Sequence, residues 1–128
     1  MKNIQADIKS GNFKQVYLLY GEEAYLKQQY KQNLVKALNP DGDTMNFNHY
    51  EGKGIDVKQL IDLCETMPFF AERRVVLLED TGFFKNKCEE LADYMKALPD
   101  YLYLVFCESE VDKRSRMYKA VKACGSIG

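Results

Sequence analysis

The chain has 128 residues, 46% hydrophobic and 29% charged, a balance that predicts one globular domain and excludes disordered or low-complexity classes. Eighteen basic residues face 19 acidic ones, so the net charge of -1 excludes a bulk polycation, and any contact with nucleic acid must be local or shared with partners. The apolar runs are too short to cross a membrane and the N-terminus has no signal-peptide core, which predicts a cytoplasmic protein with no membrane partner.

The predicted elements alternate between helix and strand along the chain. A short helix over 4–9 comes first, followed by four strand–helix units. Three strands are continuous apolar runs, typical of strands buried on both faces, and the second strand alternates as an edge strand does; they cover 16–20, 46–50, 75–78 and 101–106. The helices that follow cover 22–38, 56–67, 85–98 and 113–124. This order predicts an α/β fold, a three-layer parallel sheet with helices on both faces.

The boundaries of these elements carry their own signals. Asp56 is the expected N-cap of the helix over 56–67, and Pro68 is expected to end it. After the last helix, the alternation predicts another strand beyond the glycine-containing stretch 123–128. Residues 1–128 are therefore expected to be one domain of a longer chain.

The first strand leads into a loop that has the outline of a phosphate-binding loop. In the pattern G-x-x-x-x-G-K-[ST], Gly21 fits the first glycine and Lys27 the lysine, whereas Leu26 replaces the second glycine and Gln28 the magnesium-binding hydroxyl. A leucine side chain blocks the close approach of phosphate to backbone amides, and 22–23 adds two carboxylates where the phosphates would lie. The residues predict a degenerate P-loop with neither nucleotide nor cofactor.

Two other functions remain open on the residues alone. A divergent P-loop ATPase could use the acids Glu79 and Asp80, which end the third strand, although acids at an exposed strand end need no ligand. A response-regulator-like signalling domain would place its phosphorylated aspartate near Asp80, but the acidic pair that such a site needs is not at the end of the first strand.

The cysteines indicate free thiols. Cys64, Cys88, Cys107 and Cys124 form no CxxC pair, and the single histidine, His49, has no neighbour at metal-ligand spacing. These spacings favour neither a metal site nor a disulfide framework.

Three segments of the sequence resemble a known family, the delta subunit of the bacterial DNA polymerase III clamp loader, in its N-terminal domain. The resemblance covers roughly residues 10–124 and rests on VYLLYGEE with the following YL, on LCETMPFFAERRVVLL, and on VDKR with the later YK; these lie at 16–26, 63–78, 111–114 and 118–119.

The resemblance implies a fold like the first domain of AAA+ proteins, with a degenerate P-loop that neither binds nor hydrolyses ATP. It implies that a helical domain and an oligomerising collar follow Gly128 in the whole subunit. Such a subunit is not itself an enzyme. It binds the sliding clamp (the beta subunit) and holds its ring open for loading onto primed DNA, together with the ATP-hydrolysing and delta-prime subunits.

The family's clamp contact falls just before the third strand, on an aromatic wedge that we define as residues 67–70. The matching residues are Met67, Pro68, Phe69 and Phe70. From the sequence alone, two adjacent aromatics after a helix-breaking proline are either an exposed wedge or a buried anchor of the loop. The resemblance favours the wedge, although relatives often carry an aliphatic residue at the position of Phe69. Arg73 and Arg74 are expected to form an electrostatic rim around it that affects the association rate.

Two further features have structural and functional interpretations. The adjacent pair Phe83 and Phe84 is a second candidate wedge, but its place between a strand and a helix favours a role in sealing the end of the sheet. A basic stripe recurs along the last helix and is either a solvated face or a contact for phosphates or an acidic subunit; it comprises Lys113, Arg116, Lys119 and Lys122.

Overall fold

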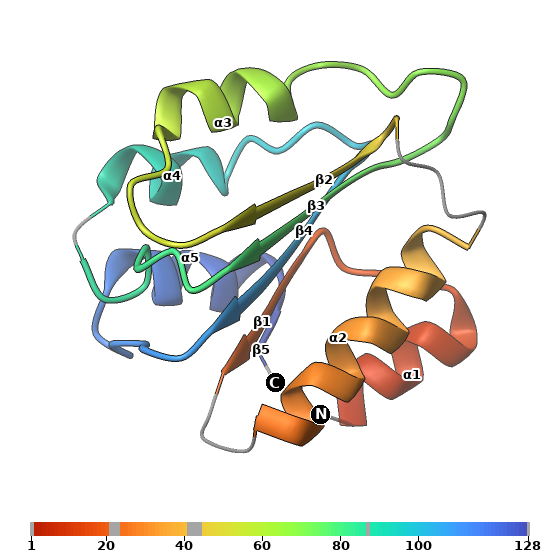
Figure 1. Ribbon diagram of the computed structural model, residues 1–128, viewed down its shortest axis with the longest axis horizontal. Coiled ribbons are helices and arrows are strands. Elements are labelled where there is room, and N and C mark those ends of the chain that lie inside the picture. The colour runs from red at the N-terminus through yellow and green to blue at the C-terminus, as the bar shows by residue number, and fades with distance from the viewer. Residues whose placement is uncertain (1, 21–23, 41–44, 87, 128) are drawn as a thin grey trace.

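Five parallel strands form one sheet with helices on both faces, as the computed structural model in Figure 1 shows. The structure describes residues 2–20, 24–40, 45–86 and 88–127. The helices are α1 Lys2–Ser10, α2 Ala24–Leu38, α3 Val57–Cys64, α4 Glu89–Tyr94 and α5 Arg116–Cys124. The strands are β1 Val16–Tyr20, β2 Phe47–Glu51, β3 Arg74–Glu79, β4 Leu102–Glu108 and β5 Ser126–Ile127.

The strand order is β2-β3-β4-β1-β5, and every pairing is parallel. This arrangement confirms the predicted α/β sheet and places β2 at an edge, as its alternating pattern indicates. The short β5 pairs with β1 in the register Tyr17↔Ser126, so a strand does follow the last helix. Within the described part of the chain, no helix is both long and apolar enough to cross a membrane.

The sheet separates two hydrophobic cores, because successive residues of a strand point to opposite faces. On β1, Val16 and Leu18 face α3, α4 and α5, while Tyr17 and Leu19 face α1 and α2. Burial on both faces explains why the apolar runs of β1, β3 and β4, at 16–20, 75–78 and 102–107, are continuous.

Helix α4 is much shorter than the predicted 85–98. On its N-terminal side the carbonyl of Gly82 accepts hydrogen bonds from two following amides, which forms a turn where a helix was predicted. On its C-terminal side Pro99 disfavours helical backbone in the preceding residue, and the chain leaves the helix after Tyr94. The apolar spacing is therefore right for the buried face, but not for the length of the helix.

The other helix boundaries follow local capping. The Asp56 side chain accepts hydrogen bonds from the amides of Lys58 and Gln59, which confirms it as the N-cap of α3. Helix α5 begins three residues later than predicted, because Ser115 is its N-cap and accepts a bond from the Tyr118 amide at 3.1 Å. Lys113 consequently lies outside the helix.

Candidate partner-binding site

The connection from α3 to β3, which we call the wedge loop (residues 65–73), carries an exposed apolar surface. Met67 is 73% exposed, Phe69 54% and Phe70 94%. Four large hydrophobic side chains are exposed in the described parts of the chain, and three of them belong to this loop. Phe69 and Phe70 are therefore not buried anchors of the loop, and they offer a contiguous apolar patch to a partner.

The two aromatic rings pack on each other. Their centroids lie 4.4 Å apart at an interplanar angle of 70°, an edge-to-face arrangement. The backbone of Phe70 has φ +53°, in the left-handed region that bulky residues rarely adopt. Such a conformation carries roughly 1 to 3 kcal/mol of strain, and an almost fully exposed ring returns little of it through burial in this domain. Folding alone gives no reason for a phenylalanine here.

Asn46, immediately before β2, fixes the backbone of the wedge. Its side-chain Nδ2 donates to the Phe69 carbonyl at 2.7 Å, and its Oδ1 accepts from the Phe69 amide. Asn46 is buried, and its own carbonyl accepts from the amide of Val75 in β3. One amide side chain thus binds both peptide groups of Phe69 in the way a neighbouring strand would. The sequence carries no signal for this contact.

Arg74 is buried beneath the same loop and holds it by hydrogen bonds, which corrects the expectation that Arg74 lies on an electrostatic rim. It is only 5% exposed. Its guanidinium donates to the carbonyls of Thr66 and Met67, at 2.7 and 3.3 Å, and to Asn48 Oδ1 at 3.2 Å. Arg74 therefore ties the wedge loop to β2 and β3 and has no surface at which to meet a partner.

Arg73 is half-buried beside the loop. Its guanidinium lies over the rings of Phe13 and Tyr103, 5.0 and 5.4 Å from their centroids, and donates to the carbonyl of Leu38. These contacts hold the guanidinium against the domain, on the α1–α2 side of the sheet. A rim formed by both arginines is not present.

The expected P-loop residues are only partly described. Gly21 lies outside the described residues, and Leu26 belongs to α2, whose first turns are described in their backbone only. Lys27 is half-buried and Gln28 exposed, both on α2. The degenerate P-loop therefore stays a prediction.

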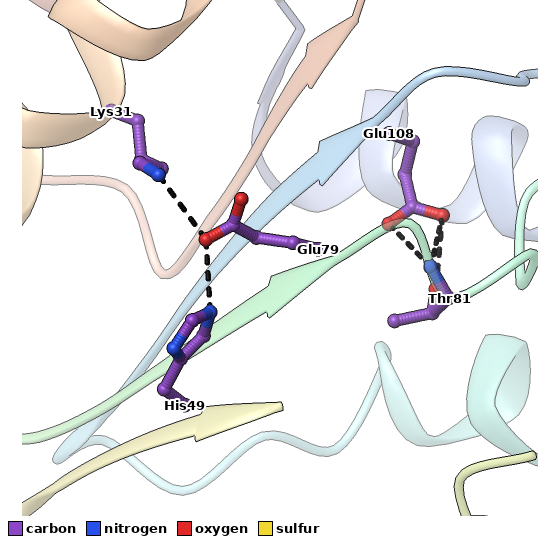
Figure 2. A network of polar contacts seen from close by, with 5 residues as sticks. All are labelled: Lys31, His49, Glu79, Thr81 and Glu108. Atoms are coloured by element: carbon purple, nitrogen blue, oxygen red, sulfur yellow. Dashed lines mark hydrogen bonds and ion pairs between the residues drawn. The ribbon is translucent and has the colours of Figure 1, made fainter. Parts of the chain in front are cut away.

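The acid that ends β3 is held by two basic side chains. Figure 2 shows Glu79 between Lys31 and His49, with its Oε1 3.2 Å from Lys31 Nζ and 2.9 Å from His49 Nε2. A carboxylate bound in this way satisfies a lysine of α2 and an imidazole of β2 within the domain. The contacts explain Glu79 structurally, without a magnesium ion.

Glu108 at the end of β4 is a second acid with a structural role. It is buried, and its carboxylate accepts bonds from the Thr81 amide and hydroxyl (Figure 2) and also from the Gly82 amide. Asp80, beside it, accepts bonds from the amide and hydroxyl of Ser109. Both acids therefore hold the β3–α4 connection against the end of β4. Asp80 therefore has a structural role, whereas the signalling interpretation needs it as a phosphorylation site.

Glu108 also predicts a pH dependence of stability. Burial raises the pKa of its carboxyl above 4.5, although the hydrogen bonds from Thr81 and Gly82 oppose the shift. The folded state then binds more protons than the unfolded state between the two pKa values, so this contribution to stability is present at low pH and is lost as the pH rises through the folded-state pKa. Above pH 4.5, we expect urea unfolding to give the Glu108→Gln variant a more positive slope of stability against pH than the wild type. Parallel curves would contradict this account.

The second aromatic pair and two residues of the basic stripe make contacts within the domain. Phe83 and Phe84 are buried, and Phe84 packs edge-to-face on Phe106, which confirms that they seal the sheet. Within the stripe, Arg116 pairs with Glu89 and Asp93 of α4, and Lys113 lies over the ring of Tyr20. The exposed Lys119 and Lys122 remain on α5.

Comparisons with known proteins match most of the length of the chain. The family model of the DNA polymerase III delta subunit matches residues 17–126. DNA polymerase III subunit delta of Bacillus subtilis (strain 168) is 29% identical over 133 residues. The match covers 94% of this chain and 38% of that protein.

Solved structures agree on the fold. The DNA clamp loader delta protein of Bacillus subtilis has a TM-score of 0.83 at 23% identity, over 98% of this chain and 41% of that one. A gamma subunit-related protein of DNA polymerase III from Thermotoga maritima has a TM-score of 0.65 at 12% identity, over 98% and 44% of the two chains. The chain spans less than half the length of these relatives. With the family model covering nearly all of it, the chain belongs to the DNA polymerase III delta subunit family.

Proposed function

We propose that this chain is the N-terminal domain of a clamp-loader subunit that binds the sliding clamp through its aromatic wedge and holds the ring open for loading onto primed DNA. The observation that carries the proposal is the wedge itself, Met67 to Phe70, exposed on a loop whose backbone Asn46 and Arg74 fix. Exposed aromatics on a fixed backbone are typical hot spots for a partner's apolar pocket.

The proposed mechanism is selective binding rather than a chemical reaction. A subunit that binds the open form of the clamp more tightly than the closed form shifts the ring toward opening by the difference in affinity. The energy for loading then comes from partner subunits that hydrolyse ATP, and delta-prime and primed DNA complete the assembly. We propose that this chain has no catalytic role.

Isothermal titration of the chain against the sliding clamp of the same organism tests the proposal. Saturable binding supports it, and the wedge variants described in the Discussion locate the contact. Absence of binding by the folded chain would overturn the proposal while leaving the family membership intact.

The ATPase alternative makes an opposite prediction. The strand-end acid Glu79 is bound by Lys31 and His49, and Gln28 supplies no hydroxyl for magnesium. We therefore expect the melting temperature of the chain to stay unchanged when millimolar ATP and Mg²⁺ are added, because only a ligand that binds the folded state raises it. A rise that grows with ATP concentration would favour the ATPase instead.

A further inference from the structure

The fourth exposed hydrophobic side chain belongs to a different segment of the chain. Met45 is 64% exposed and lies in the α2–β2 connection, more than twenty residues before the wedge. It directly precedes Asn46, whose side chain binds both peptide groups of Phe69. The backbone of Met45 is therefore one residue away from the contact that fixes the wedge.

The two segments also share a hollow in the surface. A cavity of about 530 Å³ has Asn46 and Phe70 in its wall, together with Pro40, two residues after α2, and Arg73 at the end of the wedge loop. Asn46 and Phe70 thus lie on one cavity, and Met45 directly precedes Asn46 in the chain without being part of the cavity wall. All the large hydrophobic side chains exposed in the described residues lie on one of these two segments.

We propose that Met45 is a further contact residue for the sliding clamp, so that the docking surface comprises two segments rather than one loop. This inference rests on the proposed function. A thioether is flexible and polarisable, and it fills irregular apolar pockets at little cost in strain. Met45 therefore suits the margin of an apolar groove whose centre receives the rings of Phe69 and Phe70. The partner site that this arrangement fits is an apolar groove wider than the wedge alone.

Affinity measurements on substituted chains test the contribution of Met45. We expect Met45→Ser to weaken binding of the clamp about fivefold to tenfold, in the range of a secondary interface contact, and Met45→Leu to stay within about twofold of the wild type. The melting temperature of both variants should equal that of the wild type, because the side chain is exposed. An affinity for Met45→Ser equal to the wild-type value would overturn the inference.

A photocrosslinker reports proximity independently of energy. Benzoylphenylalanine at position 45 should form a covalent adduct with the clamp, while the same group at Lys122 of α5, far from the wedge loop in Figure 1, should not. If the wild type binds and loses binding when Phe69 and Phe70 are replaced, but position 45 gives no adduct, then this inference fails and the proposed function stands. If the wild type does not bind the clamp, both fail.

Discussion

Replacing both aromatic residues of the wedge, Phe69→Ala with Phe70→Ala, should abolish binding of the sliding clamp without unfolding the domain. Each ring is a candidate hot spot, for which truncation to alanine typically loses about 2 kcal/mol or more, or roughly thirtyfold in affinity. Both rings are exposed in the free chain, so their removal leaves no cavity in either core. Calorimetric titration should give no measurable heat of binding, while the melting temperature stays within about two degrees of the wild type.

Two further variants make this experiment specific. Phe70→Gly removes the more exposed ring and also relieves the left-handed backbone, so it should be at least as stable as the wild type and yet bind the clamp more weakly. Phe84→Ala is the matched buried case and should lose about 3 to 5 kcal/mol of stability, because it opens a cavity next to Phe106. Undiminished binding by the double variant would move the clamp contact away from the wedge.

Replacing Arg74 should damage both stability and binding, although the residue itself is hidden from a partner. Arg74→Met keeps the apolar stem but leaves the carbonyls of Thr66 and Met67 and the Asn48 side chain without their donor. Hydrogen bonds from a charged donor contribute about 1.5 to 3 kcal/mol each, and part of this is recovered where water reaches the loop. We expect a loss of about 2 to 4 kcal/mol in urea unfolding and, through a looser wedge loop, about tenfold in affinity for the clamp.

Arg73→Met is the matched control. Arg73 is half-buried, and its guanidinium donates to one backbone carbonyl, that of Leu38. This variant should lose less than about 1 kcal/mol of stability. The earlier expectation of an electrostatic rim makes a different forecast, in which both substitutions slow association equally, more so at low salt, and leave stability unchanged. Equal losses of stability in the two variants would contradict the supporting role of Arg74.

The sequence predicts the sheet well because its signal is local. A strand buried on both faces is apolar along its interior, as residues 16–20, 75–78 and 102–107 are in β1, β3 and β4. Helices α4 and α5 begin later than predicted, because a turn at Gly82 and an N-cap at Ser115 precede the helical backbone where the helical pattern of the sequence has already begun. The spacing of apolar residues indicates which side chains are buried, but it does not indicate whether the backbone between them is helical.

The sequence predicts the exposed aromatic residues of the candidate site, but not the residues that support them. Two adjacent aromatics after Pro68 stand out in the sequence, whereas Asn46 and Arg74 act over long separations or beneath the surface. An asparagine before an edge strand and an arginine at the start of a core strand are ordinary surface residues by type. Their burial depends on how β2 and β3 align, which no local pattern encodes.

The attachment of the wedge to Asn46 and Arg74 has a consequence for the strength of its binding. A flexible loop must give up about 1 to 2 kcal/mol of conformational freedom per residue when it docks, and that loss opposes association. Here the ordering of Phe69 takes place when β2 and β3 pair, before any partner arrives. The wedge therefore has little conformational freedom left to lose when it docks on the proposed partner, and substitutions that loosen its attachment should weaken the complex by this added loss.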